Sequence, residues 1–149
     1  MPMRARACDE RGAELIEFSL ILPLLLLIIL GILDFGFLFQ RYEVVTNAAR
    51  EGARVRVLPG YTYDDMVARV TQFLESGDLD ETPTIPDIPV AAVDIGGTCM
   101  TLATVTVTYP HSYMFVGPLV TFFGGPALST TSLSATATMR YEGAAMACP

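Results

Sequence analysis

The chain has 149 residues, 52% of them hydrophobic, and its mean hydropathy of +0.46 is high for a soluble domain and indicates a membrane segment. The chain has nine arginines, no lysine and 16 acidic residues, so its net charge is -7. Because the sequence has no basic patch, we expect no binding to nucleic acid. The sequence lacks HExxH, P-loop, CxxC and GxSxG motifs, so it predicts no enzyme, no metal or other cofactor and no small-molecule substrate.

A long apolar run follows a short polar leader, residues 1–12. The run extends from Phe18 to Phe39 and contains one charged residue, Asp34. As a helix it spans about 33 Å, enough to cross the hydrocarbon core of a bilayer. We expect a membrane anchor rather than a cleaved signal peptide, because no small-x-small site follows the run. For Asp34, snorkelling to the headgroups is the favoured interpretation and a functional role is the alternative.

The helix is expected to continue beyond the membrane as a stalk, over residues 43–57. Four small residues recur there at helical spacing: Ala48, Ala49, Gly52 and Ala53. Small side chains let another helix approach closely. This face therefore packs either on a neighbouring subunit or on the chain's own sheet, and the sequence leaves both alternatives open.

The remaining residues predict a small α+β domain. A short amphipathic helix is expected over residues 63–75, capped by Thr62, and an acidic, proline-rich loop follows it. Residues 101–109 and 132–142 alternate between apolar and polar side chains, and residues 90–95 form a third candidate strand. The predicted fold is thus a long N-terminal helix packed on a small antiparallel sheet.

An apolar segment, residues 113–123, separates the two clear strands. It is too short to span a membrane. We expect a hairpin folded over the domain's own core, because small domains need most of their apolar residues there. The alternative is an exposed apolar patch for a partner or for the bilayer surface.

Two of the three cysteines, Cys99 and Cys148, follow the predicted span. In an oxidising compartment they could form a disulfide, and the alternative is two free thiols. The closed loop of about 50 residues would stabilise the fold by roughly 4 kcal/mol in the chain-entropy model.

Residues 11–18, "RGAELIEF", resemble the processing site of type IV prepilin-like proteins. In that group a prepilin peptidase cuts after a glycine, and the fifth residue of the mature chain is a glutamate. The corresponding residues here are Gly12, with the cut before Ala13, and Glu17. The resemblance extends to TadE-like proteins, pseudopilins of the tight-adherence (Tad, or Flp) pilus system, through Glu17-Phe18, an early Pro23, "DFG" at 34–36 and "AAREGAR" at 48–54.

The resemblance implies a minor pilin-like subunit in the bacterial inner membrane. The leader, residues 1–12, would be cytoplasmic, residues 13–58 would form the transmembrane and stalk helix, and residues 59–149 would form an extracytoplasmic domain. The implied partners are the membrane, prepilin peptidase, other Tad pilus subunits and their inner-membrane platform. Glu17 would pair with the new ammonium of a neighbouring subunit, the alternative being that it snorkels to the membrane interface. Phe18 and the small-residue face would contribute to assembly.

Two other functions are alternatives to a pilin-like subunit. The first is an unprocessed single-pass anchor that presents an extracytoplasmic protein-binding domain. The second is an enzyme, for which the only candidate residues are His111, Asp94, Ser112 and Cys99. Their spacing suggests no nucleophile-base-orienter set.

Overall fold

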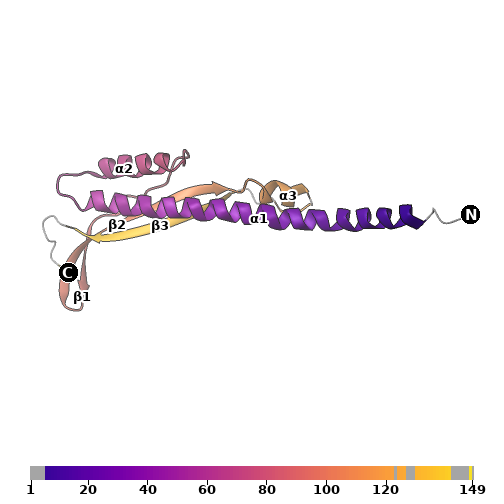
Figure 1. Ribbon diagram of the computed structural model, residues 1–149. Coiled ribbons are helices and arrows are strands. Elements are labelled where there is room, and N and C mark those ends of the chain that lie inside the picture. Colours follow the sequence, from indigo (N-terminus) through magenta and orange to yellow (C-terminus); the bar gives the residue numbers. More distant parts are fainter. Residues whose placement is uncertain (1–5, 123, 127–129, 142–147, 149) are drawn as a thin grey trace, which may run out of the picture. The chain divides into compact units, whose positions relative to one another are not determined.

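The computed structural model describes residues 6–122, 124–126, 130–141 and 148, with the backbone alone for 6–11. Parts of three predicted segments lie outside these residues: leader residues 1–5, Phe123 of the apolar segment and Glu142 of the last strand. Figure 1 shows the elements in chain order: α1 (Arg6–Arg56), α2 (Tyr63–Ser76), β1 (Ala91–Ile95), β2 (Thr98–Ser112), α3 (Val116–Phe122) and β3 (Thr130–Arg140). The predicted α+β fold class is confirmed.

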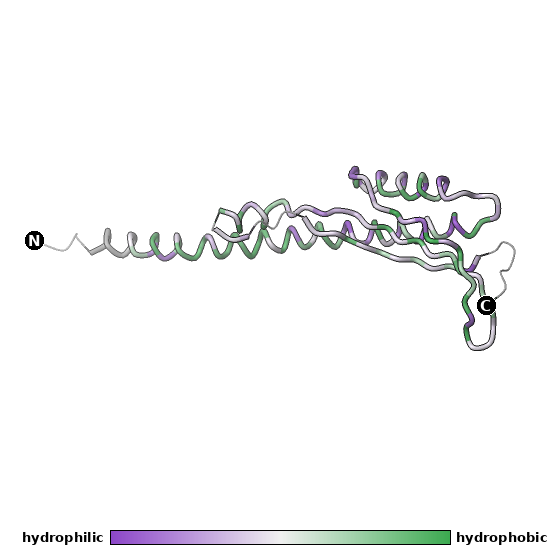
Figure 2. The backbone as a smooth tube through the Cα atoms, turned by 180° about the vertical axis from the view of Figure 1, so that it is seen from behind, coloured by the Kyte–Doolittle hydropathy of each residue, from purple (hydrophilic) through white to green (hydrophobic). Residues whose placement is uncertain are grey.

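Helix α1 runs without interruption for 51 residues, from the leader through the apolar run to the stalk, with Pro23 inside it. By length and hydropathy it is a candidate membrane span, and its most apolar stretch has a mean hydropathy of 2.7 and is not buried within the chain. Figure 2 shows hydrophobic residues concentrated in the N-terminal half of the helix. This half therefore has the surface that a lipid environment requires.

The chain divides into two compact units. The first, here called the N-terminal unit, combines Met1–Gly36 with Tyr113–Ser129. The second, called the core unit, combines Phe37–Ser112 with Thr130–Pro149. These units group residues by packing, whereas the predicted domains refer to the membrane and to processing, so the predicted boundaries stay a prediction.

The sheet of the core unit is antiparallel, in the order β1-β2-β3. Alternation along the strands puts Val105, Val107 and Tyr109 of β2 on its buried face. On the exposed face, threonine hydroxyls bond across β2 and β3, with Thr104 paired to Thr138 at 3.0 Å and Thr106 to Thr136 at 2.9 Å. One face of the sheet is thus apolar and packed while the other is polar.

Two helical segments complete the core of this unit. The fully buried alanines of α1, together with Met66, Val70 and Leu74 of α2, cluster with the apolar face of β2 and β3. At Gly52 of α1, an added Cβ would lie 2.5 Å from Cγ2 of Val70 and 3.3 Å from Cγ1 of Val105. The elements therefore approach each other as closely as a glycine permits.

Helix α2 begins at the predicted cap. Thr62 and Asp65 form a capping box, in which the Asp65 amide donates to the Thr62 hydroxyl and the Asp65 carboxylate accepts from the Thr62 amide. The backbone and side-chain hydrogen bonds from Thr62 lower the pKa of Asp65 below its ordinary value of 3.8. The amphipathic pattern of α2 and its cap together determine both its start and its buried face.

Candidate functional site: the N-terminal helix and its buried aspartate

The candidate processing residues lie on the exposed surface of α1. Gly12 is in the helix, and an added Cβ there would meet nothing within 4 Å. Ala13 and Glu17 are exposed, and Phe18 is 58% exposed. The residues around the predicted cut are thus not covered by any other described part of the chain.

Ala13 and Glu17 are four residues apart on the same helix, so they are neighbours on one face. A cut before Ala13 would place a new ammonium group about one helical turn from the Glu17 carboxylate. Both groups are exposed, so the carboxylate is accessible to a second chain as well. Glu14 is also exposed and lies one turn before Glu17.

Asp34 is buried, with 2% of its surface exposed, and lies inside the N-terminal unit. Both of its carboxylate oxygens accept hydrogen bonds from backbone amides. Met114 donates to Oδ1 at 3.1 Å, Phe115 to Oδ1 at 3.3 Å and Oδ2 at 3.0 Å, and Val116 to Oδ2 at 2.6 Å. The favoured prediction that Asp34 snorkels to the headgroups is therefore wrong, because its oxygens bind the chain itself.

The Val116 amide is the first of α3, where a helix leaves its first N–H groups without intrahelical partners, and the amides of Met114 and Phe115 come directly before it. The residues just before the helix, Tyr113 to Phe115, carry no side chain that caps well. Asp34, which lies on α1, supplies the acceptors that the segment itself lacks. The absence of a local cap in an otherwise apolar segment is the sequence signal that could have indicated a distant acceptor.

The apolar segment itself differs from its prediction. Residues 116–122 form the short helix α3 instead of part of a hairpin, and the segment belongs to the N-terminal unit and not to the core unit. Gly117 is buried, whereas Met114 is 62% exposed and Phe122 is 83% exposed. The segment thus leaves large apolar side chains on the surface of its unit.

The small-residue face of α1 lies in the core unit. Ala48, Ala49 and Ala53 have no exposed surface, and Gly52 is buried against Val70 and Val105. Of the two alternatives that the sequence left open, packing within the chain accounts for this burial.

The cysteines and the weighed catalytic candidates are also in the core unit. Cys99 and Cys148 are joined by a disulfide with their Cα atoms 5.8 Å apart. Asp94 accepts a hydrogen bond from the Gly97 amide in the β1–β2 turn, at the Cys99 end of β2. His111 is at the opposite end of β2, roughly 40 Å away at the rise of an extended strand. These residues therefore do not converge on one site.

Residues 12–54 match the family model of TadE-like proteins. This part of the chain is a TadE-like segment. The resemblance noted in the sequence is thereby confirmed for these residues, which begin at Gly12 and include Glu17, Asp34 and the small-residue face. The chain matches no curated protein and no solved structure.

The match lies within α1, the helix that is long and apolar enough to cross a membrane. The residues that the match covers therefore include both the predicted cut and the buried aspartate.

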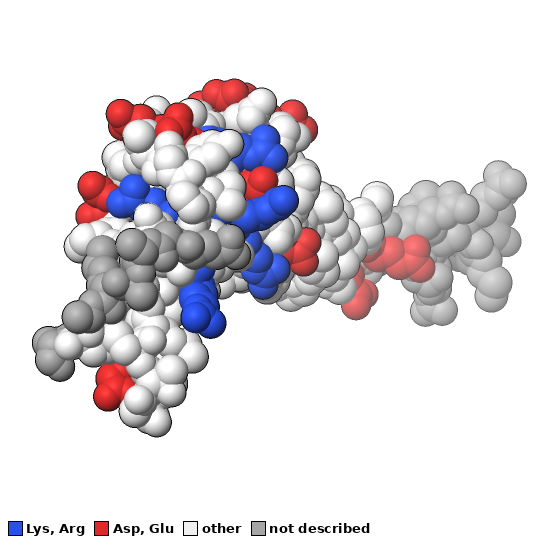
Figure 3. Space-filling view, turned by 90° about the vertical axis from the view of Figure 1, so that its left-hand side faces the viewer, with Lys and Arg blue, Asp and Glu red and all other residues white. Residues whose placement is uncertain are grey.

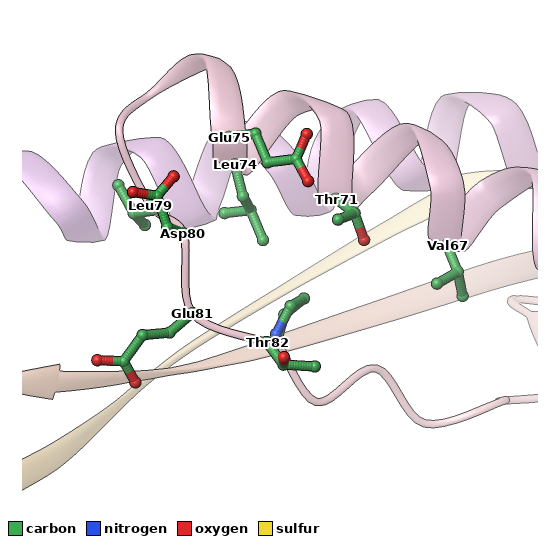
Figure 4. Close-up of a pocket in the computed structure, with 9 residues that line it drawn as sticks. Val67, Thr71, Leu74, Glu75, Leu79, Asp80, Glu81 and Thr82 are labelled. Atoms are coloured by element: carbon green, nitrogen blue, oxygen red, sulfur yellow. The ribbon is translucent and has the colours of Figure 1, made fainter.

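Outside the TadE-like segment, the described residues of the core unit form no built site on its surface. Figure 3 shows acidic and basic side chains lying next to each other. A hollow of about 190 Å³ lies between α2 and the segment after it, and Figure 4 shows that its carboxylates, from Glu75, Asp80 and Glu81, point in different directions. Among the residues that the structure describes, no group of three or more His, Cys, Asp or Glu could hold a metal ion.

Proposed function

We propose that the chain is a minor pilin-like subunit for assembly of a Tad (Flp-type) pilus or secretion system, cut by prepilin peptidase between Gly12 and Ala13. The observation that carries this proposal is the TadE-like match, which starts at Gly12 and covers a helix whose N-terminal half is exposed and apolar. The leader is cytoplasmic, and the residues beyond about 40 are extracytoplasmic. The Cys99–Cys148 disulfide supports this topology, because disulfides persist in oxidising compartments.

The surroundings of Gly12 suit a cut at this position. A peptidase needs access to the backbone, and the space around Gly12 is open. Glycine also weakens a helix by about 1 kcal/mol relative to alanine, so α1 unwinds more easily here. Both properties favour entry of this part of the helix into a protease groove.

Glu17 couples the cut to assembly. A lone carboxylate at the membrane edge is costly, and the ammonium created on Ala13 of a neighbouring subunit offers it an opposite charge. Phe18, 58% exposed, adds apolar surface beside it for contact with the neighbour. Other Tad pilus subunits and the inner-membrane platform are the partners that this model requires.

The first experiment is to determine the mature N-terminus by mass spectrometry, in cells with and without prepilin peptidase. We expect a chain that starts at Ala13 only when the peptidase is present. Gly12→Leu should leave the chain uncut, whereas the control Gly31→Leu, at another helical glycine with open space around it, should be cut normally. A chain that starts at Met1 in both cells would instead support an unprocessed anchor with a protein-binding domain.

The role of Glu17 is tested separately in cells that cut the chain. Glu17→Gln should be processed and inserted but should fail to crosslink to pilus subunits. Glu14→Gln is the matched control, because Glu14 is an exposed carboxylate one turn away on the same helix. Normal assembly of the Glu17→Gln chain would contradict the pairing mechanism while leaving the cut at Gly12 in place.

A further inference from the structure

The segment between β2 and β3 is unusually apolar. Residues 113–129 contain no charged side chain and no histidine. Its described part exposes Met114 and Phe122, at 62% and 83%. The one hydroxyl within α3, that of Thr121, donates to the carbonyl oxygens of Gly117 and Pro118 in its own helix. The surface of the segment thus offers little that water would solvate.

The segment is fixed to the membrane helix through Asp34. Three consecutive amides, those of residues 114–116, donate to its carboxylate, and this carboxylate is 98% buried. In water such amides could bind solvent instead. In a bilayer they could not, because every backbone polar group there needs a partner from the protein. Asp34 therefore removes the cost that these three amides would carry in lipid.

The position of Asp34 along α1 determines how deep in the bilayer the attached segment lies. At 1.5 Å per residue, Asp34 lies about 26 Å beyond Glu17 and about 32 Å beyond Ala13. A bilayer core is about 30 Å thick, so Asp34 lies near its outer boundary when the start of the span is at the inner one. In Figures 1 and 2, α3 lies beside α1 and extends toward the N-terminal half of that helix. This direction leads back into the membrane.

We propose that Met114–Phe122 lies in the lipid of the outer leaflet, as a second membrane contact that Asp34 attaches to the span. The occupant of its exposed apolar face is lipid, because the segment lies in the same unit as the exposed apolar part of α1 and carries no charged side chain. The inference rests on the membrane span of α1, and it does not depend on cleavage at Gly12 or on pilus assembly.

The chain contains no tryptophan, so a single introduced tryptophan reports its own surroundings. We would reconstitute the full chain in phosphatidylcholine–phosphatidylglycerol vesicles as three variants, Phe122→Trp, Leu24→Trp and Tyr61→Trp. Leu24, 62% exposed in the apolar half of α1, reports the span, and Tyr61, 53% exposed, reports the core unit. Each variant is measured with brominated lipid and with aqueous acrylamide as quenchers.

We expect Phe122→Trp to resemble Leu24→Trp, with blue-shifted emission that brominated lipid quenches and acrylamide does not. Tyr61→Trp should show the opposite pattern. Quenching of Phe122→Trp by acrylamide alone would overturn the inference and place the segment in water. Resistance to both quenchers would also overturn it, because another protein surface would then cover the segment. Quenching of Leu24→Trp by brominated lipid in the same experiment shows that the span itself is intact.

A second variant tests the role of Asp34. Asp34→Asn replaces one of the two acceptor oxygens with an amide donor, so it cannot bind all three backbone amides. Combined with Phe122→Trp, it should weaken quenching by brominated lipid and shift the emission to longer wavelength. Hydrogen exchange of the β2 amides in the core unit should not change. Unchanged lipid quenching in the Asp34→Asn chain would show that Asp34 does not hold the segment in the membrane.

Discussion

The two parts of α1 contrast sharply although they belong to one helix. In the N-terminal unit, large side chains such as Leu15 and Leu20 are 70% and 74% exposed. In the core unit, the small side chains of Ala48 and Ala49 have no exposed surface at all. Residue size is thus distributed according to what surrounds the helix. Where protein surrounds it, small residues allow close packing, and where lipid surrounds it, large apolar residues face outward.

The two units also differ in where they place polar groups. The core unit leaves its polar side chains mostly on the surface, where the threonine hydroxyls of β2 and β3 bond to each other. The N-terminal unit instead buries a carboxylate, Asp34, and saturates it with backbone amides. We therefore expect changes of side-chain size to matter most in the core unit and changes of polarity to matter most in the N-terminal unit.

The largest expected effect comes from removing a core leucine. Leu74 of α2 is 1% exposed, so Leu74→Ala should lower the free energy of unfolding of the core unit by about 2–5 kcal/mol. Leu24→Ala removes the same atoms from an exposed site in α1 and should leave the core unit unaffected. Hydrogen exchange of the β2 amides, measured on the full chain in micelles, distinguishes the two. An equal loss of protection in Leu74→Ala and Leu24→Ala would show that the exposed part of α1 and the core unit respond alike to a loss of side-chain volume.

Loss of the disulfide should have the next largest effect. The bridge joins residues 49 apart in sequence, so the chain without it should be less stable by about 2–4 kcal/mol. The change is Cys99→Ser together with Cys148→Ser, and the control is Cys8→Ser in the leader. Denaturant unfolding of the oxidised full chain measures the difference. An unchanged midpoint would mean that the bridge does not constrain the unfolded chain.

Much of the core unit could be predicted from local pattern. The cap at Thr62, the amphipathic face of α2 and the alternation of β2 and β3 each depend on residues close in sequence. Strand β2 is nevertheless longer than predicted, because it continues through Pro110. The Thr108 amide points away from β3, to Thr84, and Pro110 is two residues further with the same orientation. The amide that Pro110 lacks is therefore not one that β3 needs.

The N-terminal unit was less predictable. Its span and its candidate cut follow from hydropathy and a short motif, both of them local. The contact between Asp34 and α3 joins residues about 80 positions apart, and no periodicity encodes it. The apolar segment alone fits core, partner and bilayer equally well, because all three bury apolar side chains. The contact with Asp34 places the segment in the N-terminal unit rather than in the core, and tryptophan quenching tests lipid against a partner.

A smaller effect is expected from adding a single methyl group to α1. Gly52→Ala would place a Cβ 2.5 Å from Cγ2 of Val70, a β-branched side chain with little freedom to move. The strain should cost the core unit about 1–3 kcal/mol, less what alanine contributes as the better helix former. Gly31→Ala, with open space around it, should leave the exchange of β2 amides unchanged. Stabilisation of the core unit by Gly52→Ala would mean that Val70 repacks freely.

The smallest expected effect concerns the cap of α2, and it depends on pH. Hydrogen bonds from Thr62 lower the pKa of Asp65 in the folded chain, so their contribution to stability is fully present above the ordinary value of 3.8. It is lost as the pH falls through the lowered pKa of the folded state, where the carboxylate takes up a proton. Thr62→Ala removes the hydroxyl but keeps the backbone amide. It should therefore destabilise α2 slightly above pH 3.8 and make the loss on acidification shallower.

Ser76→Ala is the matched control for Thr62→Ala. The Ser76 hydroxyl bonds within α2, to the Phe73 carbonyl, at the opposite end of the helix from Asp65. The free energy of unfolding of each full-length variant is measured at a series of pH values on both sides of 3.8, which gives the slope of stability against pH for each variant. Equal slopes of stability against pH for Thr62→Ala and Ser76→Ala would show that the Thr62 hydroxyl does not lower the pKa of Asp65. A shallower slope for Thr62→Ala alone would place this polar effect at the start of α2, where water surrounds the capping pair and the effect stays small.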